Sequence, residues 1–95
     1  MNSKHLGSDF DEFLDEEGLL EEAEAIATKR VLAFQIAQAM KEQNLSKAAM
    51  ARRMRTSRSA VDRLLDPTVP SVTLLTIERA VRALGRRLRF EMVEA

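Results

Sequence analysis

The sequence SKAAMARRMRTSRSAVDRLL, residues 46–65, contains two short helix-forming segments separated by a break. Ser46 and Ser57 each stand immediately before one of these segments. A serine in that position accepts a hydrogen bond from a free backbone N–H group of the first helical turn. The stretch therefore predicts helices over 47–54 and 58–65, joined by a tight turn.

The composition of the two segments allows the second helix to pack across the first. Ala51 supplies the small side chain that a close helix crossing requires. Apolar residues that would face a shared core occur in both segments: Met50, Met54, Val61, Leu64 and Leu65. Two short helices packed in this way form a helix-turn-helix arrangement.

The other side of the second helix is polar. When its apolar residues face inward, its outward face carries Arg58, Ser59, Asp62 and Arg63. The major groove of B-DNA is about 12 Å wide and admits an α-helix, and an arginine there can bind guanine through two hydrogen bonds. This face is therefore a candidate DNA-contacting surface.

Upstream, the chain predicts a long helix. Residues 19–44 contain no glycine or proline, and Gly18 is expected to end a short helix within the acidic segment 1–18. One stripe of apolar residues at helical spacing consists of Ala33, Ile36, Ala37 and Met40. A second stripe beside it consists of Ala27, Val31 and Phe34. So wide an apolar surface predicts a helix that is covered on more than one side.

Downstream, Asp66 and Pro67 are expected to end the second short helix, because the residue before a proline is disfavoured in the helical conformation. Thr73 then precedes a further helix, whose inner face would carry Leu74, Ile77, Ala80, Val81 and Leu84. Gly85 suits the left-handed conformation that commonly follows a helix. The sequence thus predicts a mainly α-helical fold.

The C-terminal segment 86–95 changes to a period of two residues. Its apolar and charged positions alternate: Leu88, Phe90 and Met92 between Arg87, Arg89 and Glu91. No second strand is visible in the sequence, and a lone strand leaves its backbone groups unpaired. We therefore expect a β-strand that pairs in trans, either with its own copy across a two-fold axis or with the sheet of a partner protein.

Charge divides the chain unevenly. Fifteen acidic and fifteen basic residues cancel overall, but residues 1–27 carry a net charge of −8 and residues 28–95 a net charge of +8. We distinguish an acidic N-terminal segment (1–18), a helical DNA-binding domain (19–85) and a C-terminal strand (86–95). The basic part suits a polyanion such as DNA, although ordinary solvated faces would give the same counts.

The residue inventory argues against an enzyme. Cysteine, tryptophan and tyrosine are absent, and the chain has one histidine. No catalytic triad, metal-ligand spacing or glycine-rich phosphate loop occurs, so no cofactor or metal site is expected. The sequence also shows no secretory signal or membrane-spanning segment, so we expect a cytoplasmic protein that does not enter membranes.

Residues 46–65, followed by TLLTIERAVRALG at 73–85, resemble the Cro/C1-type (XRE) helix-turn-helix family. The resemblance covers residues 28–85 and implies a lambda-repressor-like helical bundle that binds palindromic operator DNA as a homodimer. The family usually has glycine where this chain has Arg55, and often glutamate where it has Leu65. A left-handed backbone at Arg55 would cost about 1–2 kcal/mol.

The resemblance also implies roles for individual residues. Contacts to base edges and nearby phosphates would come from Ser57, Arg58, Ser59, Asp62 and Arg63. Contacts to the phosphate backbone would come from Ser46, Lys47, Arg52, Arg53 and Arg55. For each arginine alone, a solvated surface charge is the favoured interpretation, but together on one motif the arginines favour binding of double-stranded DNA.

Small proteins of this family with an added terminal segment resemble HigA-like antitoxins, which repress their own promoter and hold a small basic toxin of the RelE/ParE type. The acidic segment would suit such a partner, because its charges would steer association and its apolar residues would anchor it. The predicted dimer or partner contacts are Phe10, Phe13, Leu14, Leu88, Phe90 and Met92.

Several alternatives fit the same sequence. The acidic segment could pack on its own domain, or it could mimic DNA and cover the recognition helix. The protein could be a stand-alone repressor without a toxin. It could also be a protein-interaction module that has lost DNA binding.

Overall fold

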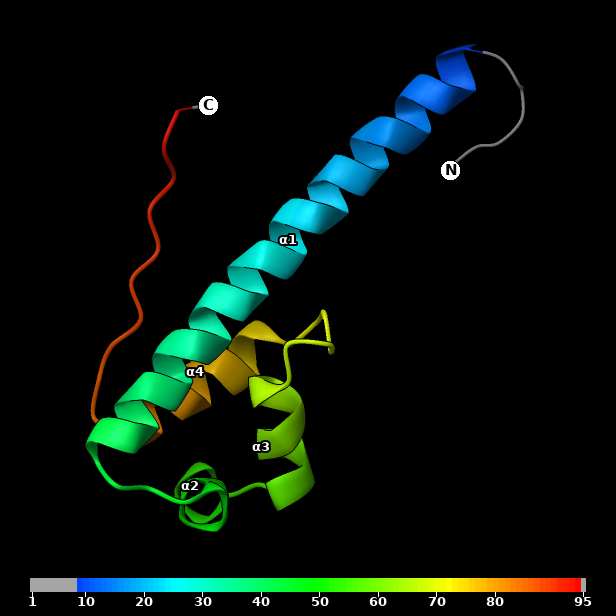
Figure 1. The fold of residues 1–95 in the computed structure, drawn as a ribbon. Helices are drawn as coiled ribbons and strands as arrows, with labels where there is room; N and C mark the ends of the chain where they lie inside the picture. Colours follow the sequence, from blue (N-terminus) through cyan, green and yellow to red (C-terminus); the bar gives the residue numbers. More distant parts are fainter. Residues whose placement is uncertain (1–8, 95) are drawn as a thin grey trace.

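The computed structural model describes residues 9–94, and their side chains from residue 22 onward. Four helices follow one another: α1 (Asp9–Glu42), α2 (Lys47–Met54), α3 (Arg58–Leu65) and α4 (Leu74–Ala83). The mainly helical fold that the sequence predicts is confirmed. Figure 1 shows the three short helices gathered at the C-terminal half of α1, while the N-terminal half of α1 extends beyond them.

The predicted helix end at Gly18 is wrong, because α1 continues without a break from Asp9 to Glu42. A glycine in a helix interior costs only about 1 kcal/mol relative to alanine. Leucine and glutamate, which favour helices, follow Gly18 in the sequence and offset that cost. The acidic and the basic parts of the chain are therefore joined by one helix.

The hydrophobic core lies where α2, α3 and α4 meet the C-terminal half of α1. Val61 of α3 and Met50 of α2 are fully buried at its centre, and Ala51 is buried as the sequence predicts. The core cluster consists of Ile36, Ala39, Met40, Met50, Ala51, Met54, Val61, Leu64, Ala80 and Leu84. Leu45, Leu65, Val72 and Ala83 are partly buried against it. This core fixes α3 relative to the other helices.

The N-termini of the short helices are capped as predicted. Ser46, Ser57 and Thr73 have extended backbones, and their side-chain oxygens accept hydrogen bonds from Ala49, Ala60 and Thr76 N–H groups, respectively. The donor–acceptor distance is 3.1 Å in all three. These bonds satisfy amides that a helix start would otherwise leave unpaired.

Three helices end at a residue in the left-handed conformation: Asn44 after α1, Arg55 after α2 and Gly85 after α4. At Arg55 (φ 58°, ψ 48°), the N–H group of Thr56 donates to Ala51 O at 2.9 Å, and that of Arg55 donates to Arg52 O at 3.1 Å. This is the Schellman motif, which satisfies carbonyls at the helix end. The expected left-handed Arg55 and the expected helix end at Gly85 are both confirmed.

The predicted coverage of the apolar faces is partly wrong. Ala37 on α1 is exposed, and Ala39 is buried instead. The second stripe of α1 is also open, with Val31 54% and Phe34 66% exposed, and Leu74 of α4 is 58% exposed. Periodicity shows which residues share a helix face, but only the packing of the other helices decides which face is covered. In the single chain, α2–α4 cover α1 from one side.

The C-terminal segment 86–94 does not form a strand in the single chain. Figure 1 shows it turning back from the end of α4 toward the N-terminal end of α1. An ion pair between Arg86 and Glu42, 3.0 Å long, fixes the start of this segment against α1. The predicted strand requires a second strand, and the described residues of one chain offer none.

Candidate nucleic-acid interface

The helices α2 and α3 form a unit with a three-residue connection, residues 55–57. In Figure 1, α2 is seen nearly end-on and α3 along its length, so the two helices cross at a large angle. The left-handed Arg55 reverses the chain after α2, and Ser57 starts α3. The buried Val61 and Leu64 hold the inner side of α3 on the core, which leaves its other side free.

Every residue predicted to contact base edges is exposed, either on α3 or at its N-cap. These residues, all exposed, are Ser57, Arg58, Ser59, Asp62 and Arg63. Because α3 is held rigidly by the core, its outer face presents two guanidinium groups, one carboxylate and two hydroxyls in fixed order. That arrangement offers hydrogen-bond donors and acceptors to an external polar surface.

Two of the predicted contact residues bind each other. Lys47, at the start of α2, forms an ion pair with Asp62 of α3, with Nζ and Oδ1 2.9 Å apart, and both side chains are about half exposed. The pair links the start of α2 to the middle of α3 and neutralises the carboxylate on α3. The cationic character of this face therefore comes from Arg58 and Arg63.

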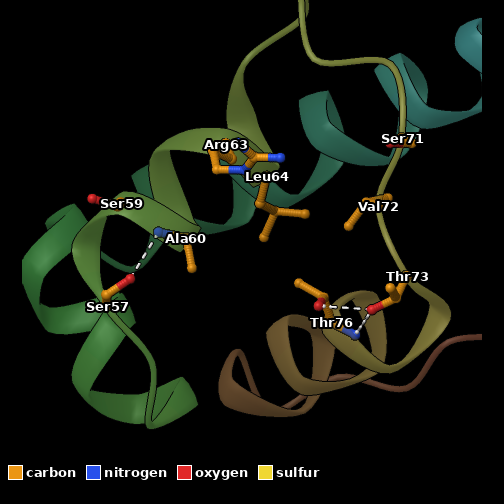
Figure 2. Close-up of a pocket in the computed structure, with 9 residues that line it drawn as sticks. All are labelled: Ser57, Ser59, Ala60, Arg63, Leu64, Ser71, Val72, Thr73 and Thr76. Carbon is orange, nitrogen blue, oxygen red and sulfur yellow. Dashed lines mark hydrogen bonds between the residues drawn. The ribbon is translucent and has the colours of Figure 1, made fainter.

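A groove of about 480 Å³ lies between α3 and the start of α4. Figure 2 shows Leu64, Ala60 and Val72 along it, with Ser57 at one end and Thr73 and Thr76 on the α4 side. The Thr73 hydroxyl accepts a hydrogen bond from Thr76 N–H and lies 2.9 Å from the Thr76 hydroxyl. Arg63 borders the same groove. The groove thus adds hydroxyl groups beside an arginine of α3.

The α4 side of this groove was not found from the sequence. The sequence pattern predicts Thr73 only as a helix cap and indicates no contact role for Ser71 or Thr76. The loop 66–73 brings them next to α3, and nothing in their local sequence indicates that proximity. The run of hydroxyl residues at 71, 73 and 76 is a weak signal that only the tertiary structure makes meaningful.

The residues predicted to contact phosphates lie on the surface, and one of them has a structural contact as well. All of them, Ser46, Lys47, Arg52, Arg53 and Arg55, are exposed. Arg53, however, donates to the carbonyl of Ala83 at 3.1 Å and so helps to terminate α4. Arg53 and Arg55 line a second hollow together with Arg79 and Arg82 of α4. A basic surface therefore continues from the α2–α3 turn onto α4.

Lys29 of α1 holds the C-terminus of α3. Its side chain is buried, and its ammonium donates to the carbonyls of Asp66 at 2.7 Å and Arg63 at 3.2 Å. Burial lowers the pKa of Lys29 from its ordinary value of 10.5, and the Asp66 carboxylate opposes that shift. A positive charge at a helix C-terminus is favourable. Nothing in the sequence around Lys29 indicates that its side chain is buried.

Asp66 closes α3 on the other side of the same junction. Its carboxylate accepts hydrogen bonds from the Thr68 hydroxyl at 2.7 Å and the Thr68 N–H group at 2.8 Å. These bonds, the hydroxyl first, lower the pKa of Asp66 from its ordinary value of 3.8. Lys29 and Asp66 together fix the junction between the C-terminus of α3 and the loop that follows it.

The predicted partner contacts lie away from α3. Phe10, Phe13 and Leu14 belong to α1, and their side chains lie outside the described ones. Leu88 is half-buried beside α1, and Phe90 and Met92 are exposed. The structure therefore separates the α3 face from the C-terminal segment.

Within the described residues, no three His, Cys, Asp or Glu side chains converge as ligands for a metal ion. None of the described helices combines the length and the apolar character needed to cross a membrane.

Comparisons of the chain with protein-family models, with curated proteins and with solved structures gave no match.

Proposed function

We propose that the protein is a sequence-specific regulator of transcription that binds double-stranded DNA through a helix-turn-helix formed by α2 and α3. The observation that carries this proposal is the exposed face of α3, where Arg58 and Arg63 stand on a helix whose opposite side is buried. A rigid helix with outward arginines can enter the major groove and bind guanine edges.

In this proposal α3 is the recognition helix and α2 lies across the phosphate backbone. The N-terminus of α2 has capped amides and Lys47 beside it, an arrangement that favours a phosphate group. A phosphate there would compete with Asp62 for Lys47. The exposed Arg52 and Arg55 would add attraction that does not depend on base sequence.

The groove between α3 and α4 extends the proposed contact. Its hydroxyls at Ser57 and Thr73 lie on either side of the space that Arg63 borders. Hydroxyl groups commonly bind phosphate oxygens and fix a protein's register on the duplex. We assign Thr73 and Ser71 to backbone positioning and Arg63 to base contact.

A gel-shift experiment with the DNA upstream of the protein's own gene tests this proposal. Wild-type protein is expected to bind, with affinity falling by orders of magnitude between about 50 and 200 mM salt. Arg63→Ala should weaken binding by about tenfold or more, because one bidentate base contact contributes about 1–3 kcal/mol. Arg87→Ala, which removes an exposed arginine of the C-terminal segment outside the hollow that Arg53, Arg55 and Arg82 line, is the matched control. Equal loss in both variants would contradict the assignment to α3.

We further propose that the regulator is the autorepressing antitoxin of a toxin–antitoxin pair. What supports this role is the charge of residues 1–27, the resemblance to HigA-like antitoxins, and the extension of α1 beyond the DNA-binding unit. A basic toxin could bind there without covering α3. Gel filtration with the product of the neighbouring gene should show co-elution at micromolar concentration, and separate elution would leave a stand-alone repressor.

A further inference from the structure

The C-terminal segment is extended and its backbone is unpaired. Within the described residues, the Arg86 N–H group bonds back to Val81 O at 3.0 Å, and no backbone hydrogen bond involves residues 87–94. Its apolar side chains are open to solvent, with Phe90 62% and Met92 101% exposed. An exposed strand with an apolar face is a template for pairing with another strand.

The order of charges in this segment is complementary to a second, antiparallel copy of the same segment. In an antiparallel pair related by a two-fold axis at Phe90, Arg89 lies directly opposite Glu91 of the second copy. Because of the symmetry, Glu91 also lies opposite Arg89 of the second copy. Further out, at the edges of the face that carries Phe90, Arg86 lies opposite Glu94. The four charges nearest the axis then alternate in sign on one face of the strand pair, and opposite charges across strands stabilise a sheet.

Neighbouring registers lack this complementarity. An axis at Arg89 would place two arginines opposite each other, and an axis at Glu91 would place two glutamates opposite each other. In the single chain, Arg89 and Glu91 already form an ion pair 3.1 Å long, with both side chains largely exposed. The two side chains therefore lie on one side of the extended backbone, as the paired arrangement requires.

The apolar face of the segment is complementary in the same register. Phe90 lies opposite Phe90 of the second copy, and Leu88 lies opposite Met92. Leu88 lines a groove of about 340 Å³ along α1, together with the exposed Phe34. Met92 of the second copy would thus arrive beside this groove, where apolar surface of α1 is uncovered.

From these observations we infer that the occupant of the C-terminal surface is a second copy of this chain, paired antiparallel through residues 86–94 with the two-fold axis at Phe90. A symmetric contact of this kind uses the same patch of each copy and closes on itself. The pairing supplies the missing strand partner and does not depend on the proposed DNA binding.

Charge reversal tests the register. Sedimentation equilibrium of the wild-type protein without DNA is expected to show a dimer. Arg89→Glu alone and Glu91→Arg alone should each raise the dimer dissociation constant about tenfold or more, because two symmetric pairs become repulsive. The double variant Arg89→Glu/Glu91→Arg should return it to within about threefold of wild type.

Mixing the two single variants separates contacts between chains from the ion pair within each chain. In the mixed dimer, both glutamates of one copy face both arginines of the other, so the mixture should associate more tightly than either variant alone. Circular dichroism should show unchanged helix content in every variant, because the segment lies outside the core. A monomeric wild type, or single variants that associate like wild type, would overturn the inference. A double variant as weak as the single ones would overturn it as well.

Discussion

Single residues with unusual conformations or burial set the position of α3. Arg55 holds a left-handed backbone at the turn before it, and Lys29 and Asp66 fix the junction after it. The turn was predictable, because the sequence breaks between two capped helices. The buried Lys29 was not predictable, because its acceptors, the carbonyls of Arg63 and Asp66, come from a distant part of the chain.

Replacing Arg55 with glycine should stabilise the protein. The left-handed conformation costs a side-chain-bearing residue about 1–2 kcal/mol, and glycine avoids most of this cost but gains freedom in the unfolded chain. We expect Arg55→Gly to raise the free energy of unfolding by up to about 1 kcal/mol in urea titrations. Arg52→Gly, inside α2, is the matched control and should lower it by about 1 kcal/mol. A destabilised Arg55→Gly variant would show that the arginine side chain stabilises the turn.

Asp66 should make stability depend on acid pH. Its pKa in the folded protein lies below the ordinary 3.8, so the unfolded chain binds more protons as the pH falls toward the folded pKa. The stabilisation is therefore complete above about pH 4 and is lost as the pH falls through the folded pKa. The Asp66→Asn variant keeps an oxygen acceptor for Thr68 but has no charge to lose.

Urea unfolding of the wild type and Asp66→Asn at several pH values from about 5 to 2 measures this effect. The difference in stability between the two proteins should shrink as the pH falls. A difference that stays constant over this range would mean that Asp66 is not stabilised as a carboxylate in the folded state.

At the level of helices, local signals were sufficient for α2, α3 and α4. Serine and threonine caps, the Asp66-Pro67 stop and Gly85 act within a few residues, so the sequence predicted these helix bounds. Features that depend on contacts with other parts of the chain were not predicted. Gly18 did not end α1, and the groove beside α3 depends on a loop that brings Thr73 close to it.

The ion pair between α2 and α3 should limit DNA affinity. Asp62→Asn removes a negative charge from the face of α3 and frees Lys47 to bind a phosphate. We expect DNA affinity to rise about threefold to tenfold, with a steeper salt dependence, in fluorescence-anisotropy titrations. Stability should fall by no more than about 1 kcal/mol, because the pair is half exposed.

Glu42→Gln is the matched control for this prediction. It removes the same charge from the end of α1, where Glu42 pairs with Arg86, and should leave DNA affinity nearly unchanged. Weaker DNA binding by Asp62→Asn would indicate that the carboxylate itself contacts a base.

At the level of the whole molecule, separate surfaces serve the proposed contacts. The α3 face carries the arginines, residues 1–27 carry the negative charge, and the C-terminal segment carries the open apolar face. The sequence identified the α3 residues because helical spacing puts them on one face. It could not show that Val31 and Phe34 remain open, because coverage depends on what packs against α1.

The central claim, that α3 reads DNA sequence, is tested most directly by the ratio of affinities for promoter DNA and for unrelated DNA of the same length. Wild-type protein should prefer the promoter DNA, whereas Arg58→Ala/Arg63→Ala should bind both DNAs with nearly equal, weak affinity. The ratio is insensitive to the loss of charge itself, because both DNAs carry the same phosphates. A double variant that keeps the wild-type preference would contradict the assignment of α3 as the recognition helix.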